Sequence, residues 1–107
     1  MDPKTQALFE ARADIVKALA HPTRLFIVNE LSKGERCVCE LREGVGADMS
    51  TVSKHLSVLK NAGVVEDDKR GLQVYYRLCC PCILNFFGCV ESVLQENARR
   101  QRALVNE

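Results

Sequence analysis

The fold is limited most by a single pair of strand-like runs in a chain that otherwise carries helical patterns. Residues 64–66 and 72–78 are rich in β-branched and aromatic side chains, and the charged residues 67–70 and Gly71 stand between them. This pattern predicts one β-hairpin with a charged tip. Because only this hairpin and helices are available, a fold built on strand–helix–strand units is excluded.

The rest of the chain is predicted to be helical, because its apolar residues recur every three or four positions. Proline in a first turn opens three of the segments, Asp48 suits an N-cap, and glycines end two of the helices. The predicted helices cover about residues 4–19, 22–34, 39–44, 48–63 and 81–98, and a short extended piece covers residues 36–38. The fold class is therefore mainly α with a small β-hairpin, in the order helix-helix-strand-helix-helix-hairpin-helix. That order is a winged helix-turn-helix with an extra helix at each end, in a single domain over residues 1–107.

Composition adds limits on location and partners. The chain has 15 Lys and Arg against 14 Asp and Glu, so its net charge of +1 indicates no nucleic-acid partner by itself. No apolar run is long enough to cross a bilayer, and residues 1–6 lack the basic-then-apolar pattern of a signal peptide. We therefore expect a cytoplasmic protein with no membrane partner, in which thiols stay reduced.

The fourth predicted helix has the two faces that a DNA-reading helix needs. On a helical wheel Val52, Leu56 and Leu59 lie on one side, and short hydroxyl side chains and a lysine lie on the other. Such side chains suit close approach to phosphates and base edges, and the basic hairpin tip extends this surface. The alternative is a solvated polar face, but the order of elements favours DNA. The predicted DNA contacts are Ser50, Thr51, Ser53, Lys54, His55, Ser57, Lys60, Lys69 and Arg70.

His55 differs from the other predicted contacts because it falls nearer the buried side of the wheel. A structural role, bonded to the backbone or to a phosphate, is favoured over metal ligation for this side chain.

Five of the six cysteines stand in two groups. The first cysteine group is Cys37 and Cys39, the second is Cys79, Cys80 and Cys82, and Cys89 stands apart. In a reducing compartment such groups indicate a metal site or a redox switch rather than a disulfide framework. Soft thiolates select soft metal ions, so all five grouped cysteines are predicted metal ligands. The alternative is that they simply fill small spaces in the core.

Two further expectations concern the second cysteine group and Cys89. A helix that opens at Pro81 would favour the thiolate form of Cys80 and Cys82, through the backbone N–H groups at its start. Cys89 lies two helical turns beyond Cys82, about 10 Å along the axis. It is therefore assigned to packing before ligation.

Three stretches carry a family resemblance. Residues 50–65 read STVSKHLSVLKNAGVV, residues 20–25 read AHPTRL, and residues 71–78 end in Tyr-Tyr-Arg-Leu. Together they resemble the ArsR/SmtB family of bacterial metalloregulatory repressors, over about residues 10–95. The resemblance implies a homodimer whose first and last helices, about residues 4–19 and 81–98, form the interface. It also implies that double-stranded operator DNA is bound in the apo state and released when an inducer binds.

The first cysteine group carries a narrower resemblance. Residues 35–41, ERCVCEL, resemble the thiolate motif of the arsenic-sensing branch of that family, in which a third cysteine often follows where Arg42 stands here. Cys37 and Cys39 alone therefore lack the three soft donors that arsenite or antimonite prefers. Because residues two apart point to opposite sides of a helix, a ligand shared by these two cysteines is expected to disrupt the start of the helix that supports the recognition helix.

The missing donors are sought in the second cysteine group. In winged-helix folds the short first strand pairs antiparallel with the second hairpin strand, which would set Cys37 near Leu78 and Cys79. We hypothesise that the first group combines with one or two cysteines of the second group within one protomer. A site built from the second group alone is the rival arrangement.

The predicted function is a repressor that releases operator DNA when As(III) or Sb(III) binds cysteine thiolates, with no constitutive cofactor. The same fold is compatible with Cd(II) or Pb(II) as inducer, or with a thiol-redox or persulfide signal. The sequence Cys79-Cys80-Pro81-Cys82 contains the spacing of a thioredoxin motif, but the strand–helix–strand context of thioredoxin is missing, so no enzyme is predicted.

Overall fold

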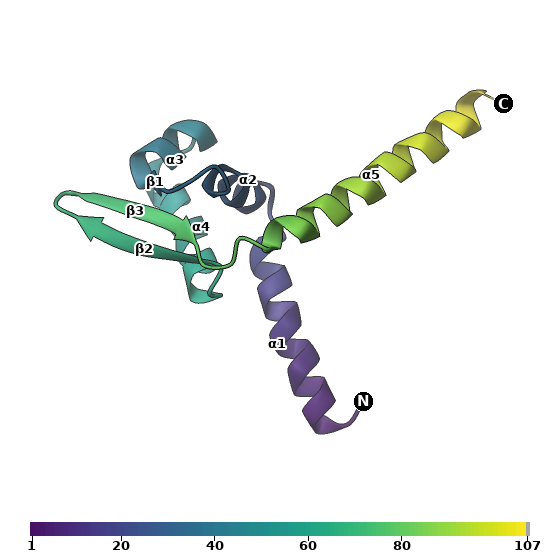
Figure 1. The fold of residues 1–107 in the computed structure, drawn as a ribbon, viewed down its shortest axis with the longest axis horizontal. Helices are drawn as coiled ribbons and strands as arrows, with labels where there is room; N and C mark the ends of the chain where they lie inside the picture. Colours follow the sequence, from purple (N-terminus) through teal and green to yellow (C-terminus); the bar gives the residue numbers. More distant parts are fainter. Residues whose placement is uncertain (107) are drawn as a thin grey trace.

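The computed structural model describes residues 1–106 and has the predicted order of elements (Figure 1). Five helices and three strands follow one another along the chain. They are α1 (Pro3–Leu19), α2 (Pro22–Leu31), β1 (Arg36–Cys37), α3 (Val38–Val45), α4 (Met49–Asn61), β2 (Val65–Arg70), β3 (Gln73–Leu78) and α5 (Ile83–Asn106). The strands form one antiparallel sheet in the order β1-β3-β2. The predicted fold class, mainly α with a small β-hairpin, is confirmed.

A small apolar core joins α2, α3 and α4 to the base of the sheet. Val52, Leu56 and Leu59 of α4 are fully buried in it, which confirms the predicted inner face of this helix. The core is completed by Leu19, Ile27, Val28, Leu31, Leu41, Val64 and Val65. Within the described residues no polar or charged side chain is fully buried, so this core is held by apolar packing.

Local signals set the start of each helix in the helix-turn-helix. The side chain of Asp48 accepts a hydrogen bond of 2.8 Å from the Thr51 backbone N–H, which caps α4 as predicted. Hydrogen bonding by the Thr51 side chain, followed by its backbone N–H, lowers the pKa of Asp48. The Cys37 sulfur accepts from the Glu40 backbone N–H, and the Glu40 side chain accepts from the Cys37 backbone N–H. This reciprocal capping box begins α3 at Val38. Gly46, with φ of 75°, ends α3 and turns the chain towards α4.

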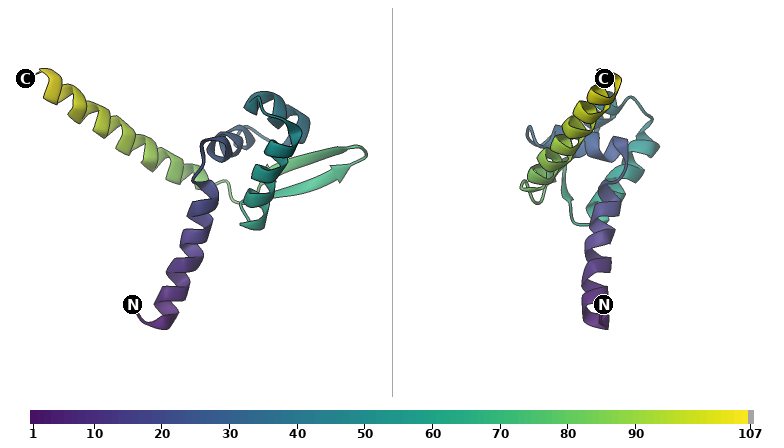
Figure 2. Two further views of the ribbon diagram at one scale, coloured as in Figure 1. Left: turned by 180° about the vertical axis from the view of Figure 1, so that it is seen from behind. Right: turned by 90° about the vertical axis from the view of Figure 1, so that its right-hand side faces the viewer.

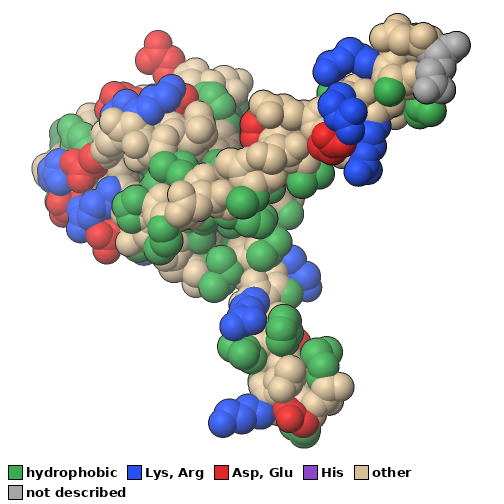
Figure 3. All heavy atoms as spheres, turned by 45° about the vertical axis from the view of Figure 1, so that its right-hand side comes forward, with side chains coloured by type: hydrophobic (Ala, Val, Ile, Leu, Met, Phe, Trp, Pro, Cys, Tyr) green, Lys and Arg blue, Asp and Glu red, His purple; other side chains and the backbone are tan. Residues whose placement is uncertain are grey.

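The two terminal helices stand away from this body. Figures 1 and 2 show α1 and α5 leaving one junction in different directions, and the radius of gyration is 17.0 Å. A compact chain of this length would have a radius of about 13 Å. Apolar side chains on both helices are exposed, and Figure 3 shows hydrophobic side chains where the helices leave the body and along α1. They include Leu8, Phe9, Ile15, Val16, Phe86, Val90, Val93 and Leu94.

The last helix differs in its bounds from the prediction. It begins at Ile83 rather than at residue 81, because residues 79–82 form the turn that leads out of β3. It continues to Asn106 rather than ending near residue 98. Glu96 pairs with Arg99 at 2.6 Å and with Arg100 at 3.4 Å, and ion pairs at this spacing support a helix through a polar segment.

The first strand pairs with the predicted partner in a different register. Pairing of β1 with β3 is antiparallel, as expected, but Arg36 lies opposite Tyr76 and Cys37 opposite Tyr75. The expected partners were Leu78 and Cys79. Residue 35, just before the strand, is tied by an ion pair to Arg70 beside the hairpin tip, and this contact accompanies the shift of β1 towards the tip.

Candidate DNA surface and cysteine sites

The outer face of α4 carries an exposed row of hydroxyl and basic side chains. Lys54 lies at the middle of this row, and the inner side of the helix is the buried apolar set already described. The exposed members among the predicted DNA contacts of α4 are Ser50, Thr51, Ser53, Lys54, Ser57 and Lys60. This polar outer face is the one expected of a recognition helix. The preceding helix, α3, packs against α4 and holds it in position.

His55 is not part of the exposed row. Its ring packs on His21 with ring centroids 4.4 Å apart, and its Nδ1 lies 3.3 Å from Nη1 of Arg24. Arg24 also donates hydrogen bonds to the backbone carbonyls of Ala18 and Lys17 at the end of α1. Burial, followed by the charges of His21 and Arg24, lowers the pKa of His55.

This cluster gives His55 a structural position between the end of α1, the start of α2 and the recognition helix. The partner of the imidazole is the guanidinium of Arg24, where the sequence favoured backbone or phosphate. Arg24 lies within the AHPTRL motif, but nothing in the sequence indicated that it reaches His55, 31 residues further along the chain.

The basic residues of the hairpin are mostly paired with carboxylates. Arg70 donates to both carboxylate oxygens of Glu35, at 2.6 and 2.9 Å, and to Asp68 at 2.9 Å. Its guanidinium also lies over the ring of Tyr75, 4.6 Å from the centroid. Lys60 of α4 pairs with Asp67 of β2 at 3.0 Å. The predicted DNA contacts Lys60 and Arg70 are therefore held by acidic neighbours, while Lys54 and Lys69 form no ion pair within residues 1–106.

The first cysteine group lies where β1 meets α3. Cys37 is buried and Cys39 is exposed, and their sulfurs are joined in a disulfide with the Cα atoms 5.4 Å apart. That Cα separation is within the range that a disulfide spans. The sequence had instead predicted free thiols, because a reducing compartment disfavours disulfides. The Cys39 sulfur also lies 3.7 Å from Oε1 of Gln73 at the start of β3.

A link between these two sulfurs coexists with a regular helix. Cys37 is the N-cap, with an extended backbone, and only Cys39 lies inside α3. The expectation that a ligand shared by Cys37 and Cys39 disrupts the start of this helix stays a prediction. It treated both residues as helical, whereas the helix begins between them.

The second cysteine group lies in the turn between β3 and α5. The sulfurs of Cys80 and Cys82 are 2.9 Å apart, and both residues are exposed. The Cys79 backbone N–H donates to the carbonyl of Val64 at 3.0 Å. Cys80 and Cys82 line a hollow of about 290 Å³ together with Ile15, Ala62, Gly63, Val64 and Ile83.

Cys82 is not the activated thiolate that a helix start suggests. The hydrogen bond with Cys80, followed by the charge on Cys80, raises the pKa of Cys82. Burial, followed by the nearby Glu66 carboxylate, raises the pKa of Cys79. The close contact with Cys80 therefore opposes ionisation of Cys82, and this effect exceeds the opposing effect of the backbone at the start of α5.

The two cysteine groups do not come together in the protomer. Cys37 lies opposite Tyr75, and Cys79 follows four residues later, about 13 Å further along an extended chain. Within residues 1–106 no set of three or more Cys, His, Asp or Glu side chains is arranged to hold one metal ion. Cys89 is exposed on α5, apart from both groups.

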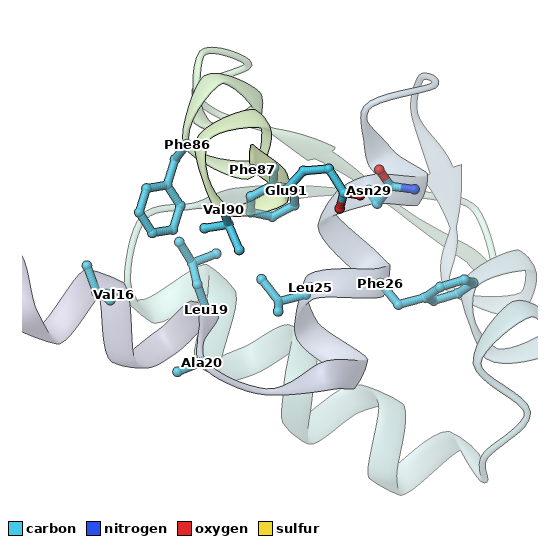
Figure 4. A pocket seen from close by; sticks show the side chains of 10 residues that line it. All are labelled: Val16, Leu19, Ala20, Leu25, Phe26, Asn29, Phe86, Phe87, Val90 and Glu91. Atoms are coloured by element: carbon cyan, nitrogen blue, oxygen red, sulfur yellow. The ribbon is translucent and has the colours of Figure 1, made fainter. Parts of the chain in front are cut away.

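A larger apolar groove lies between the terminal helices and α2 (Figure 4). It measures about 440 Å³, and Val90 of α5 faces Leu25 of α2 across it. Asn29 and Glu91 are the polar members of its lining. No helix within residues 1–106 is both long and apolar enough to cross a membrane.

The sequence is similar to that of known bacterial regulatory proteins. Residues 21–67, from the start of α2 into β2, match the family described as "Bacterial regulatory protein, arsR family". The "HTH-type transcriptional repressor SmtB" of Mycobacterium tuberculosis is 40% identical over 76 residues, which are 71% of this chain and 56% of the relative. The chain thus spans about half the length of this relative. The "Transcriptional repressor SmtB homolog" of Synechocystis is 32% identical over 99 residues, covering 91% of this chain and 75% of the relative.

A solved structure supports the same assignment. The solution structure of the homodimeric winged helix-turn-helix DNA-binding domain Mb0332 from Mycobacterium bovis, a possible ArsR-family regulator, is 32% identical with a TM-score of 0.79. The match covers 94% of this chain and 93% of that domain, so the similarity extends over the terminal helices as well as the central body.

Proposed function

The chain belongs to the arsR family of bacterial regulatory proteins, and we propose that it is a DNA-binding transcriptional repressor induced by a thiophilic metalloid, As(III) or Sb(III). The observation that carries the repressor proposal is α4, with its buried apolar face and its exposed row of hydroxyl and lysine side chains. The observation that carries the inducer proposal is the close pair of exposed thiols at Cys80 and Cys82.

In the proposed complex α4 enters the major groove of operator DNA. Lys54 and the serine and threonine hydroxyls of its outer face bind phosphates and base edges. Lys69 at the hairpin tip adds a contact to the DNA backbone. Such a repressor acts in the cytoplasm, where the DNA is, and is not an enzyme.

We propose that the active form is a homodimer formed through α1 and α5. Both helices expose apolar side chains, and α5 has no buried residue in the protomer. Exposed apolar surface of this extent marks an interaction site. The groove between α1, α2 and α5 lies on the same surface and would be covered by the partner. The relative from Mycobacterium bovis is described as homodimeric.

The inducer is proposed to bind the second cysteine group. One arsenite, As(OH)₃, reacts with three thiols to form three As–S bonds and release three water molecules, with no change in oxidation state. Cys80 and Cys82 are already adjacent, and Cys79 is one residue away in the same turn. Recruiting Cys79 has to rearrange the turn that carries α5, which would move the dimer helix relative to α4.

A site that combines the two cysteine groups would require larger structural changes than a site within the second group. It requires Cys37 to leave its disulfide, its capping role and its place opposite Tyr75. We therefore propose the second group as the inducer site and retain Cys37 and Cys39 as a second thiol pair beside the hairpin.

The test is release of a labelled operator from the protein's own promoter. Arsenite is titrated into the reduced dimer, with cadmium, zinc and persulfide in parallel. Release by arsenite, abolished in Cys80→Ser and Cys82→Ser but retained in Cys89→Ser, is the expected result. Release only by persulfide or peroxide would replace the metalloid by a redox signal, and failure of the reduced apo protein to bind DNA would refute the repressor.

A further inference from the structure

We propose that Cys80, Cys82 and the adjoining hollow form a site for trivalent arsenicals that carry one apolar carbon substituent. This proposal rests on the proposed function and specifies the class of inducer that the second cysteine group takes. The ligand has the form R–As(III), in which R is a small alkyl or aryl group. The two sulfurs bind arsenic, and the hollow takes R.

Apart from its two thiols, the hollow has an apolar lining. Apart from the two thiols, its side chains come from Ile15, Ala62, Val64 and Ile83, and Gly63 contributes backbone only. No charged or hydrogen-bonding side chain other than the thiols is part of that lining. By contrast, the hollow beside α3 is lined by Glu30, Arg36, Glu40 and Glu43, and the groove of Figure 4 has no cysteine.

Two cysteines, Cys80 and Cys82, line the hollow. The sulfurs of Cys80 and Cys82 are 2.9 Å apart, so one atom can bridge both. Cys79 is absent from the lining, and its backbone N–H is engaged with Val64. Arsenic held here by two sulfurs therefore has its third bond beside apolar side chains rather than beside a third thiol.

The third bond of arsenic decides which ligand this site prefers. R–As(OH)₂ reacts with two thiols to form two As–S bonds and two water molecules, and arsenic stays trivalent. A carbon substituent then gains from leaving water. A hydroxyl at the same position would lose its hydrogen bonds in an apolar hollow, which is unfavourable. The site thus favours R–As(III) over arsenite, which needs Cys79 to move.

The size of the hollow suits a ring. Its volume is about 290 Å³, and an apolar cavity of about 150 Å³ already binds benzene. Phenyl and methyl substituents both fit, and phenyl fills more of the space.

The position of the hollow explains how the ligand would act. It lies between α1, through Ile15, the turn from α4 into β2, through Ala62 to Val64, and the start of α5, through Ile83. Figure 1 shows the two terminal helices diverging from this junction. An occupant therefore contacts both proposed dimer helices and the end of the recognition helix.

The experiment compares phenylarsine oxide, methylarsenite and arsenite on the reduced, full-length protein. A Cys37→Ser/Cys39→Ser variant leaves Cys80 and Cys82 as the close thiol pair, and intact-mass analysis counts phenylarsenic groups per protomer. We expect one group, lost in Cys80→Ser, and release of operator DNA at an at least tenfold lower concentration of phenylarsine oxide than of arsenite.

A size change in the hollow separates the substituent from the thiols. Ala62→Leu narrows the hollow without touching a cysteine, and Ala103→Leu, exposed near the end of α5, is the matched control. We expect Ala62→Leu to raise the required phenylarsine oxide concentration at least tenfold, with the arsenite response and the apo affinity for DNA unchanged. Ala103→Leu should change neither response.

Three results would overturn the inference. They are absence of the phenylarsenic adduct from the Cys37→Ser/Cys39→Ser variant, equal release by arsenite and phenylarsine oxide, and an unchanged phenylarsine response in Ala62→Leu. Failure of arsenite to release DNA while the phenylarsenic adduct forms and releases it would instead overturn the inorganic inducer under Proposed function and leave this inference standing.

Discussion

The ion pair between Glu35 and Arg70 predicts that a single neutral substitution will change how DNA binding depends on salt. Arg70 belongs to the hairpin that approaches DNA in the proposed complex, yet both of its terminal nitrogens are bound to Glu35 at 2.6 and 2.9 Å. Arg77 lies 3.6 Å from the same carboxylate. The Glu35→Gln substitution keeps the shape of the side chain and removes the negative charge that holds Arg70.

The size of the expected effect depends on how exposed the ion pair is and on how many phosphates the freed arginines bind. The side chains of Arg70 and Glu35 are 48% and 29% exposed, so the pair contributes only about 0.2–1 kcal/mol to folding. A freed arginine that binds one phosphate steepens the plot of log affinity against log salt by about 0.9, and a dimer contributes two such contacts. Between 50 and 200 mM salt the affinity of the variant should therefore fall about tenfold more than that of the parent.

The assay is fluorescence anisotropy with operator DNA at several salt concentrations. Glu30→Gln is the matched control, because Glu30 near the end of α2 pairs at 3.1 Å with Lys33, which is not a residue of the hairpin. We expect the slope to steepen only in Glu35→Gln, with the midpoint of urea unfolding nearly unchanged. An unchanged or shallower slope would refute the reasoning, because Arg70 would then either miss the DNA or depend on Glu35 to reach it.

Three further predictions follow from the core, the histidine cluster and the terminal helices. Leu56→Ala removes a fully buried side chain and should lower the free energy of unfolding by about 2–5 kcal/mol in urea titration, whereas Val105→Ala on the exposed end of α5 should change it little. The folded-state pKa of His55 lies below its unfolded value of 6.5, so the unfolded chain binds more protons in that range. Stability should therefore fall as the pH drops below about 6.5, and His55→Gln should remove part of that fall; an unaltered pH profile would contradict it. Val90→Asp places a charge in the proposed dimer surface and should shift the protein towards monomer in sedimentation equilibrium, unlike Ser92→Asp two residues away.

The order of elements was predictable because it depends on local signals. The β-branched and aromatic runs predicted the hairpin, Asp48 predicted the start of α4, and the spacing of Val52, Leu56 and Leu59 predicted its buried face. Each of these signals acts over a few residues, so tertiary packing did not alter them. The end of α5 was missed because its polar tail lacks an apolar period, and its ion pairs support the helix instead.

Contacts between distant segments were not predictable in the same way. The register of β1 against β3 decides whether Cys37 meets Cys79 or Tyr75, and two strand residues carry too little pattern to specify it. The pairing of Arg70 with Glu35 and of Arg24 with His55 depends on the same long-range placement. Composition predicted that the cysteines carry the sensing chemistry, but it did not indicate which of them are neighbours.

Because the two cysteine groups are separated, thiol chemistry can act at two different positions in the proposed repressor. Cys39 contacts Gln73, and Cys37 follows the Glu35 that holds Arg70, so the first group adjoins the hairpin. Cys80 and Cys82 adjoin the start of α5 and therefore the proposed dimer interface. A dimeric reader of DNA needs its two recognition helices one helical turn of DNA apart, about 34 Å, and that spacing is set by the dimer helices. A ligand at the second group would alter the spacing and so weaken both half-site contacts together, whereas one at the first group would alter only the hairpin contact of its own protomer. This difference is the physical reason for assigning induction to the second group.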